Sequence, residues 1–267
     1  MLKDITLGQY FPGNTIVHRL DPRIKLILTV VYITALFLAR GVLAYALMLI
    51  ALLTCLSLSR IKPKAALSGL RPVMIIILIT VILNIFFVRG DTVLFEYRWI
   101  VITSEGVFTA VFMAVRLMML IIGTFLLTYT TSPIALTDGI ERMLNPLKKI
   151  KLPVHELAMM MSIALRMIPT LIEETDKIMS AQKARGADFE TGGLIKRAKA
   201  IIPLVVPLFI SAFRRADELA VAMESRCYHG GEGRTRMKVL KTAARDYIAL
   251  LCGAIIIAAV IFLGRVA

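Results

Sequence analysis

Residues 107–131 read VFTAVFMAVRLMMLIIGTFLLTYTT, and this stretch decides the class of fold. Arg116 is the one charged residue in it. A helix needs about 20 consecutive apolar residues to cross the hydrocarbon core of a bilayer. The stretch is long enough to span a membrane, so it predicts a transmembrane helix rather than the buried helix of a soluble domain.

Four further apolar runs lie on either side of this stretch, at 26–39, 42–58, 72–88 and 247–264. Together with residues 107–131 they predict an all-α integral membrane protein with about five transmembrane helices. The first two runs are each slightly short of a span, and only Arg40 and Gly41 separate them. They therefore predict either an antiparallel pair of helices or one bent segment.

The composition of the whole chain agrees with a membrane protein. Hydrophobic residues make up 58% of the 267 residues and the mean hydropathy is +0.79, whereas soluble domains are nearer ~45–50% apolar. The chain has 32 Lys and Arg against 18 Asp and Glu, a net charge of +14. This excess suits a multi-pass protein of the cell membrane, because cytoplasmic loops collect Lys and Arg. A lipid membrane is the expected partner and nucleic acid is not, since runs of hydrocarbon length dominate the chain.

The distribution of basic residues predicts the orientation. Lys and Arg are concentrated in the N-terminal segment and in 59–71, whereas 89–106 mixes both signs of charge. The positive-inside rule places the first two in the cytoplasm and 89–106 outside. Segment 132–246 holds 19 of the 32 Lys and Arg and is also expected in the cytoplasm. With five spans, the C-terminus would then lie outside.

Three regions are therefore expected: an N-terminal membrane region with about four spans at 1–131, a cytoplasmic helical module at 132–234, and a basic connector with the last transmembrane helix at 235–267.

Residues 1–25 are not expected to be a cleavable signal peptide, because no short apolar core follows a basic start. The cysteines Cys55, Cys227 and Cys252 lack the spacing of a disulfide framework or zinc site, so unpaired thiols are expected.

A short helix at about 133–148 and two long helix-permissive stretches make up the module. The first long stretch runs to Arg185 with a kink expected at Pro169, and the second runs to Arg226 with bends expected at its prolines. Their parts 157–165 and 201–213 are apolar enough to lie in or against the membrane. The alternative that 201–213 belongs to another span is disfavoured, because the stretch is too short.

Each long stretch ends on an arginine between small residues, in Ala184-Arg185-Gly186 and Ser225-Arg226-Cys227. A cation at a helix C-terminus is ordinary, because the helix dipole favours it. Small neighbours also leave a guanidinium accessible, and its fork can bind a carboxylate through two hydrogen bonds. When the two stretches are aligned on their arginines, Asp176 also meets Asp217, which indicates a faint internal repeat. The pattern therefore indicates either two ordinary helix ends or two docking sites on similar partners.

The sequence lacks the patterns that catalysis would need. No P-loop motif occurs, and His18, His155 and His229 have no metal-ligand spacing. The acidic pairs Glu173-Glu174 and Asp217-Glu218 have Lys or Arg at helical spacing, which is typical of solvated helix faces. We therefore expect neither an enzyme nor a metal site in this chain.

Two features of the apolar segments leave alternatives open. Arg116 lies within a predicted span, where a charge is costly and faces protein or water. It either pairs with another helix or extends its side chain to the membrane surface, or it takes part directly in transport. Methionines cluster in pairs and triplets among the 14 in the chain, for example at 159–161. Because methionine is flexible, these clusters indicate either core filling or a surface that repacks against changing partners.

The motifs taken together resemble one known family. In chain order they are Pro12-Gly13, HRLDPR at 18–23, LTDGIE at 136–141, PVHELA at 153–158, Leu165-Arg166 with Ile168-Pro169, the motif ending at Gly186, FRRADELA at 213–220, the motif at Arg226, and GRTR at 233–236. Their order and spacing resemble the transmembrane T components (EcfT) of energy-coupling factor transporters over nearly the whole chain.

The resemblance implies roles for the two arginine motifs. In that family, two cytoplasmic coupling helices end in Ala-Arg-Gly-like motifs that dock onto two ABC-type ATPase subunits of the EcfA and EcfA′ type. Carried over, Arg185 and Arg226 dock the ATPases, and their flanks are Ala184, Gly186, Ser225 and Cys227. The second motif departs from the family pattern, because Ser and Cys replace Ala and Gly. Termination of that helix is therefore expected to fall to Gly230.

The resemblance also implies a function. A separate substrate-binding S component would pack against the coupling helices, at residues that include Met159, Met160, Leu165, Leu204 and Leu208. The chain would link ATP hydrolysis to movement of that component in vitamin or micronutrient uptake. It would bind no cofactor itself, since ATP and Mg would be used by the partner ATPases. The match at 233–236 favours a shared type that serves several vitamin S components, although a dedicated type remains open.

Two other functions remain as alternatives. The permease subunit of a conventional ABC importer would also dock ATPases, but it would need a polar substrate pathway through its own spans. A membrane-embedded enzyme with its active site in 132–246 would need a convergent acid–base or metal constellation, and the sequence offers none.

Overall fold

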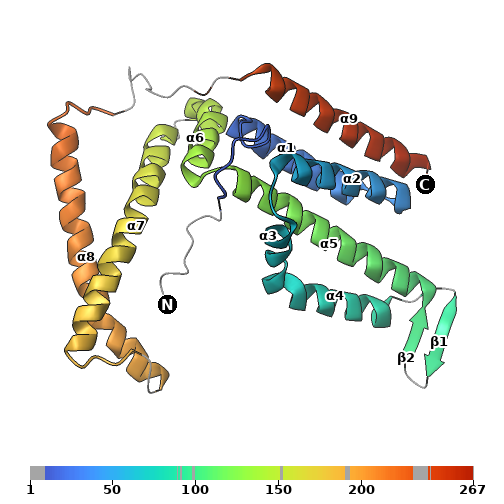
Figure 1. Ribbon diagram of the computed structural model, residues 1–267, viewed down its shortest axis with the longest axis horizontal. Coiled ribbons are helices and arrows are strands. Elements are labelled where there is room, and N and C mark those ends of the chain that lie inside the picture. The colour runs from blue at the N-terminus through green and yellow to red at the C-terminus, as the bar shows by residue number, and fades with distance from the viewer. Residues whose placement is uncertain are drawn as a thin grey trace. The chain divides into compact units, whose positions relative to one another are not determined.

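The computed structural model describes residues 10–88, 90, 92–97, 100–150, 153–189, 193–230, 240 and 242–266, and these parts are mostly helical (Figure 1). The elements in chain order are α1 (Pro22–Leu38), α2 (Gly41–Ser59), α3 (Pro63–Ser68), the 3-10 turn Arg71–Val73, α4 (Met74–Phe87), β1 (Val93–Tyr97), β2 (Ile100–Thr103), α5 (Ser104–Thr130), α6 (Pro133–Leu144), the 3-10 turn Asn145–Ile150, α7 (Val154–Ala184), α8 (Leu194–Glu224) and α9 (Ala244–Val266). The predicted all-α membrane fold is confirmed. The antiparallel hairpin β1–β2 was not predicted.

Five helices in the described part of the chain are long and apolar enough to cross a membrane. They are Gly41–Ser59, Pro63–Phe87, Ser104–Thr130, Val154–Ala184 and Ala244–Arg265. The number agrees with the prediction, but the membership differs. Helix α1 is not among them, because it has only 17 residues. It ends at Leu38 because the backbone becomes extended at Ala39. Helix α7 qualifies because its apolar first half continues without a break into the charged second half.

The predicted ambiguity between a helix pair and one bent segment is resolved in favour of the pair. Ala39 and Arg40 both adopt extended backbone angles between α1 and α2. Gly41 follows with a φ of 74°, in the left-handed region that glycine adopts without steric cost. These three residues reverse the chain between two separate helices.

The chain divides into two compact units. The bundle unit comprises Gly8–Gly139 and Leu240–Ala267, and the hairpin unit includes Ile140–Val239. In the bundle unit, α1, α2, α5 and α9 share one buried core. Its members are Ala35, Leu36, Ala39, Ala44, Tyr45, Met48, Leu52, Met119 and Val260.

Small residues let the helices of the bundle unit approach closely, as is usual between membrane helices. A Cβ added at Gly123 of α5 would lie 2.3 Å from the ring of Tyr32 on α1. The Tyr32 hydroxyl donates a hydrogen bond of 3.0 Å to the Met119 carbonyl, so the ring is held in that space. Similarly, a Cβ at Gly253 of α9 would lie 2.6 Å from Leu28. These two glycines therefore set the spacing of α1 against α5 and α9.

The outer surface of this unit is suited to lipid. On α4, Ile75, Ile76, Leu78 and Ile79 are each at least half exposed, and Phe87 is 78% exposed. A soluble domain rarely presents so continuous an apolar surface to water. The exposed side chains of α4 therefore face the hydrocarbon of a membrane.

The hairpin unit is built on α7 and α8, which pack against each other. Helix α7 continues through Pro169, and α8 continues through Pro203 and Pro207. The prolines therefore end neither helix. Helix α6 ends at Leu144, and a 3-10 turn takes up the rest of the predicted short helix.

Candidate functional site

The C-terminus of α7 is closed by two specific backbone hydrogen bonds. The Gly186 N–H donates to the Lys183 carbonyl at 3.0 Å, and the Ala187 N–H donates to the Gln182 carbonyl at 2.9 Å. Gly186 has a φ of 87°. This is the Schellman arrangement, in which a left-handed residue lets the chain satisfy the last helical carbonyls. No atom lies within 4 Å of a Cβ added at Gly186, so this position needs glycine for its backbone angle and not for space.

The C-terminus of α8 is closed in the same way. The Cys227 N–H donates to the Glu224 carbonyl at 2.8 Å, and the Tyr228 N–H donates to the Met223 carbonyl at 3.1 Å. Cys227 takes the left-handed position with a φ of 57°. The prediction that Gly230 ends this helix is therefore wrong. A non-glycine residue in this conformation costs roughly 1–2 kcal/mol, so this end of the helix is strained where the first is not.

The two helix ends are thus equivalent residue by residue. Arg185 and Arg226 both occupy the last position before the left-handed residue, and the alignment that places these arginines together also places Gly186 on Cys227. Both arginines are exposed, and so are the flanking residues Ala184, Gly186, Ser225 and Cys227. No ion pair involves either guanidinium among the described residues of the hairpin unit. Each arginine is therefore accessible to another protein.

An ion pair joins α7 and α8 at equivalent positions. The Arg215 Nη2 atom lies 3.0 Å from Glu174 Oε2. The spacing from Glu174 to Arg185 along α7 equals the spacing from Arg215 to Arg226 along α8. At about 1.5 Å per residue, each terminal arginine lies about 16 Å along its helix from the pair. Figure 1 shows that α7 and α8 run in opposite senses, so the two ends extend away from the pair in opposite directions.

The predicted S-component contacts are exposed to different degrees. Met160 is 54% exposed, whereas Met159, Leu165, Leu204 and Leu208 are half-buried. The exposed apolar face of α8 consists of neighbouring residues within the apolar stretch 201–213, and none of them is among the predicted contacts. They are Ile201, Ile202, Val205, Val206, Phe209, Ile210 and Phe213. Their helical spacing could have identified them, because 202, 206, 209 and 213 repeat every three or four residues.

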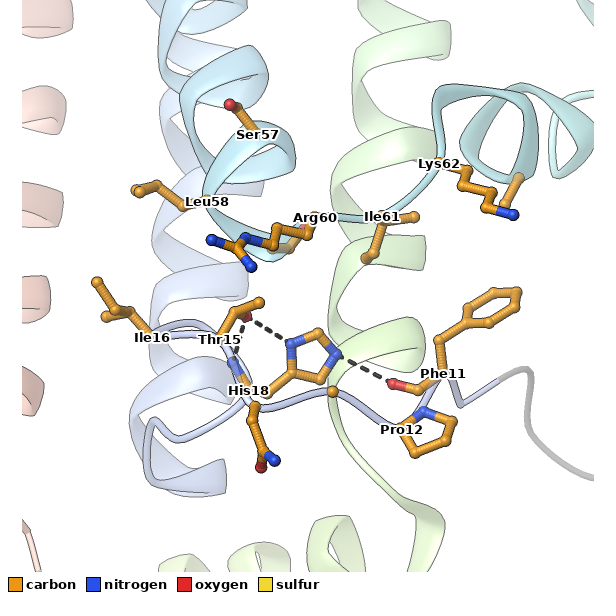
Figure 2. Close-up of a pocket in the computed structure, with 14 residues that line it drawn as sticks. Phe11, Pro12, Thr15, Ile16, His18, Ser57, Leu58, Arg60, Ile61 and Lys62 are labelled. Atoms are coloured by element: carbon orange, nitrogen blue, oxygen red, sulfur yellow. Dashed lines mark hydrogen bonds between the residues drawn. The ribbon is translucent and has the colours of Figure 1, made fainter.

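The polar residues at the start of the chain hold the bundle unit together. In Figure 2, His18 bridges its own segment, with Nδ1 2.7 Å from the Thr15 hydroxyl and Nε2 3.0 Å from the Phe11 carbonyl. Burial lowers the pKa of His18 below its usual value, because it disfavours the charged ring. The carbonyl accepts from Nε2–H, so the neutral ring uses Nδ1 as the acceptor for the Thr15 hydroxyl.

The beginning of α1 is tied to α5 and α9. Lys25 is buried and donates hydrogen bonds from Nζ to the carbonyls of His18 and Thr130. Buried Asp246 at the start of α9 accepts a hydrogen bond of 2.9 Å from the Asp21 N–H. The HRLDPR motif and Lys25 together therefore connect α1, α5 and α9 in the bundle unit.

Arg116 within α5 is paired with protein groups. Its Nε donates to the Tyr45 hydroxyl at 2.7 Å, and its guanidinium lies 5.6 Å from the Tyr45 ring centre and 5.9 Å from that of Phe37. These contacts compensate part of the desolvation of the charge. They favour the interpretation that Arg116 joins α5 to α1 and α2.

His155 at the start of α7 contacts α6, because its Nδ1 atom lies 3.0 Å from Glu141 Oε1. This contact links α6 to α7.

In the described parts of the chain, no three His, Cys, Asp or Glu residues are grouped as metal ligands. The three cysteines are free thiols. The motif at 233–236 lies outside the described residues, and so does Lys3, one of the basic residues of the N-terminal segment.

Comparisons with known proteins give the family. Residues 13–237 match the CbiQ family, described as cobalt transport protein. The chain is 55% identical over 258 residues to a Clostridium kluyveri protein named energy-coupling factor transporter transmembrane protein EcfT, with 96% of both chains covered. It is 48% identical to the Bacillus subtilis protein of the same name, with 99% of this chain and 100% of that protein covered. A Lactococcus lactis protein of that name is 47% identical, with 98% of both chains covered. The matched length, together with the helical membrane fold, shows that the chain belongs to the EcfT family of energy-coupling factor transporter transmembrane proteins.

Proposed function

We propose that this chain is the energy-coupling scaffold of its transporter, linking two ABC-type ATPase subunits to a substrate-binding S component. The observation that carries the proposal is the pair of equivalent helix ends at Arg185 and Arg226. Each presents an exposed guanidinium at a helix terminus, and the two ends extend in opposite directions from the ion pair between α7 and α8. Two similar docking sites suit two similar partners.

The chemistry of the helix ends supports docking to acidic grooves. A guanidinium makes two parallel hydrogen bonds to a carboxylate, and these charge-assisted bonds are about twice as strong as neutral ones. The fixed caps at Gly186 and Cys227 present each arginine in the same backbone geometry. A rigid presentation lowers the entropy lost on binding.

The mechanism that follows is mechanical. ATP binding closes the ATPase dimer, the docked ends of α7 and α8 move with it, and the long helices shift. Their apolar faces then release or reorient the substrate-loaded S component. The effect of ATP is limited by the difference in its affinity for the two states of the complex. This chain breaks no bond and binds no cofactor, and ATP and Mg act in the ATPase subunits.

The apolar face of α8 and the Met160 side of α7 are the proposed contacts of the S component. We also propose that the N-terminus and the helices that end in the two arginines lie in the cytoplasm, within a protein of the cell membrane. The excess of Lys and Arg in these segments supports this orientation. We also favour a shared type that serves several vitamin S components, because the names of the EcfT relatives specify no single substrate.

A mild-detergent pull-down of the tagged chain from its native membranes tests the proposal. We expect two ABC ATPases and one or several small membrane proteins, and the variety of these small partners separates a shared from a dedicated scaffold. Recovery of the chain alone would overturn the coupling role. Recovery with ATPases and a second large permease would instead support a conventional importer.

A further inference from the structure

A cavity of about 770 Å³ lies between the N-terminal segment and the junction of α2 and α3 in the bundle unit. Figure 2 shows the N-terminal residues Phe11, Thr15 and His18 on one side and the junction residues Arg60 and Lys62 on the other. None of the residues that line it is acidic, whereas Arg60 and Lys62 are both exposed cations. No ion pair engages either of them within the described residues. The cavity therefore carries uncompensated positive charge.

The position of the cavity along α2 gives its depth in the membrane. Gly41–Ser59 is a candidate span of 19 residues, which at about 1.5 Å per residue is close to the thickness of the hydrocarbon core. Arg60 and Lys62 follow directly after this span. They consequently lie at the level of the lipid headgroups.

The rim of the cavity combines these cations with apolar side chains. Ile16 is 62% exposed, Leu58 is 49% exposed and Phe11 is 47% exposed. A free anion in water would gain nothing from such neighbours. A phospholipid offers both a phosphate for the cations and an acyl chain for the apolar rim, and basic pockets beside membrane helices are known to bind acidic headgroups.

The floor of the cavity is fixed by His18. A Cβ added at Gly13 would lie 2.9 Å from the imidazole ring, so the ring packs directly on the glycine. The hydrogen bonds from the ring to Thr15 and Phe11 hold it in this position. The shape is therefore preformed by the N-terminal segment rather than by a ligand.

We propose that this cavity is a binding site for the phosphate headgroup of an anionic phospholipid, with Arg60 and Lys62 as the phosphate ligands. The site is independent of the ATPase and S-component contacts, which lie in the hairpin unit. It would anchor the α2–α3 junction and the N-terminal segment to the same lipid.

The proposal can be tested with the full chain, purified in detergent and titrated with phosphatidylglycerol or phosphatidylcholine, with bound lipid measured by native mass spectrometry. We expect one phosphatidylglycerol to bind in preference to phosphatidylcholine. The double variant Arg60→Gln with Lys62→Gln should weaken it about 30-fold, and Lys62→Gln alone about fivefold. Lys64→Gln is the matched control, because Lys64 is an exposed cation of the same junction that does not line the cavity.

Three results would overturn the proposal. An equal loss in Lys64→Gln would mean that general surface charge attracts the lipid. Inorganic phosphate that binds as tightly as phosphatidylglycerol, with the same dependence on Arg60 and Lys62, would identify a free-anion site. A Gly13→Ala variant keeps both cations but displaces the His18 ring, so binding that survives in it unchanged would exclude the cavity as the site. Thermal unfolding of each variant in phosphatidylcholine identifies any variant that is misfolded. If the double variant is misfolded, the single variant Lys62→Gln provides the binding test.

Discussion

At the scale of single residues, the two arginine motifs differ from ordinary helix ends by what surrounds them. Both arginines sit directly before a residue with a positive φ, and both are exposed. The left-handed residue turns the chain away from the helix axis, so the arginine is the last side chain that the helix presents. This geometry leaves each guanidinium exposed at the very end of its helix, as the proposed docking role requires.

Charge reversal at either arginine should weaken ATPase binding. We expect Arg185→Glu and Arg226→Glu each to reduce the affinity at least tenfold, because a favourable charge-assisted contact becomes a repulsion. Affinity for the purified ATPases can be measured by biolayer interferometry with the chain in nanodiscs. Lys177→Glu is the control, since Lys177 is an exposed cation of α7 away from its end. Wild-type affinity in both arginine variants would refute the docking role.

The strain at Cys227 leads to a second residue-scale prediction. Cys227→Gly should stabilise the end of α8 by about 1 kcal/mol, because glycine adopts a positive φ without steric cost. Gly186→Ala should destabilise the end of α7 by a similar amount. Amide hydrogen exchange of residues 221–228 and 181–187 measures both effects. Unchanged exchange rates in both variants would mean that the left-handed angles carry no strain.

At the scale of helices, the pair Glu174–Arg215 is the link between α7 and α8. The side chains of Arg215 and Glu174 are 41% and 21% exposed, so the pair's own contribution to stability is modest, of the order of 0.2–1 kcal/mol. Its position matters more, because it joins α7 and α8 at the same distance from Arg185 and from Arg226, the two proposed docking residues. Motion of one end is therefore expected to reach the other through this contact.

A charge-swap series tests this link. Glu174→Arg or Arg215→Glu alone places like charges opposite each other and should lower ATP-driven uptake of the assembled complex several-fold. The double swap restores an attractive pair and should recover most of the activity. ATPase binding, measured in parallel, should stay unchanged in all three. A double swap no better than the single variants would remove the pair from the coupling route.

A charge on the apolar faces of these helices should separate the two classes of partner. Met160→Asp and Phe209→Asp each place a carboxylate on a highly exposed apolar position. We expect loss of the S component from the purified complex, because burial of an unpaired charge is costly, with the ATPases retained. Ser180→Asp is the control, since it adds the same carboxylate at an exposed position on the charged half of α7 and should retain the S component. Loss of the ATPases from the Met160 or Phe209 variants would contradict this division of roles.

At the scale of the whole molecule, the described residues contain five candidate spans. Helix α1, with 17 residues, is too short to be counted among them. Helix α7 combines an apolar half and a charged half within a single helix. This division suits a helix whose first half contacts apolar surroundings and whose second half lies in water. The proposed coupling role requires that both arginine ends lie on the cytoplasmic side of the membrane.

Thiol labelling tests that sidedness. Cys227 is exposed next to Arg226, whereas Cys55 and Cys252 lie in the candidate spans α2 and α9. A membrane-impermeant maleimide reaches only the side of the membrane to which it is added, and only a thiol in water reacts. If the end of α8 is cytoplasmic, we expect labelling in inverted vesicles, whose cytoplasmic face points outward, but not in intact cells. Cys227→Ser should abolish the labelling. Labelling of intact cells that is lost in Cys227→Ser would place the end of α8 outside.

Much of this fold could be predicted from the sequence because its signals are local. Apolar runs of membrane length specify helices wherever they occur, and Gly186 ends α7 through its own backbone freedom. The position of Arg185 and Arg226 at helix ends follows from the same local rules. The closing role of Cys227 was missed because cysteine carries no turn signal, although its alignment with Gly186 in the repeat offered one.

The sequence by itself therefore determined the membrane class, the helices and the two arginine ends, since each depends on neighbours a few residues away. Only the tertiary structure decided the pairing of Glu174 with Arg215, the seating of Arg116 against Tyr45, and the packing of Tyr32 on Gly123. These contacts join residues far apart in the chain. The shapes of the packed helices decide which of these residues meet. The hydrophobic pattern of the sequence does not specify which helix packs against which.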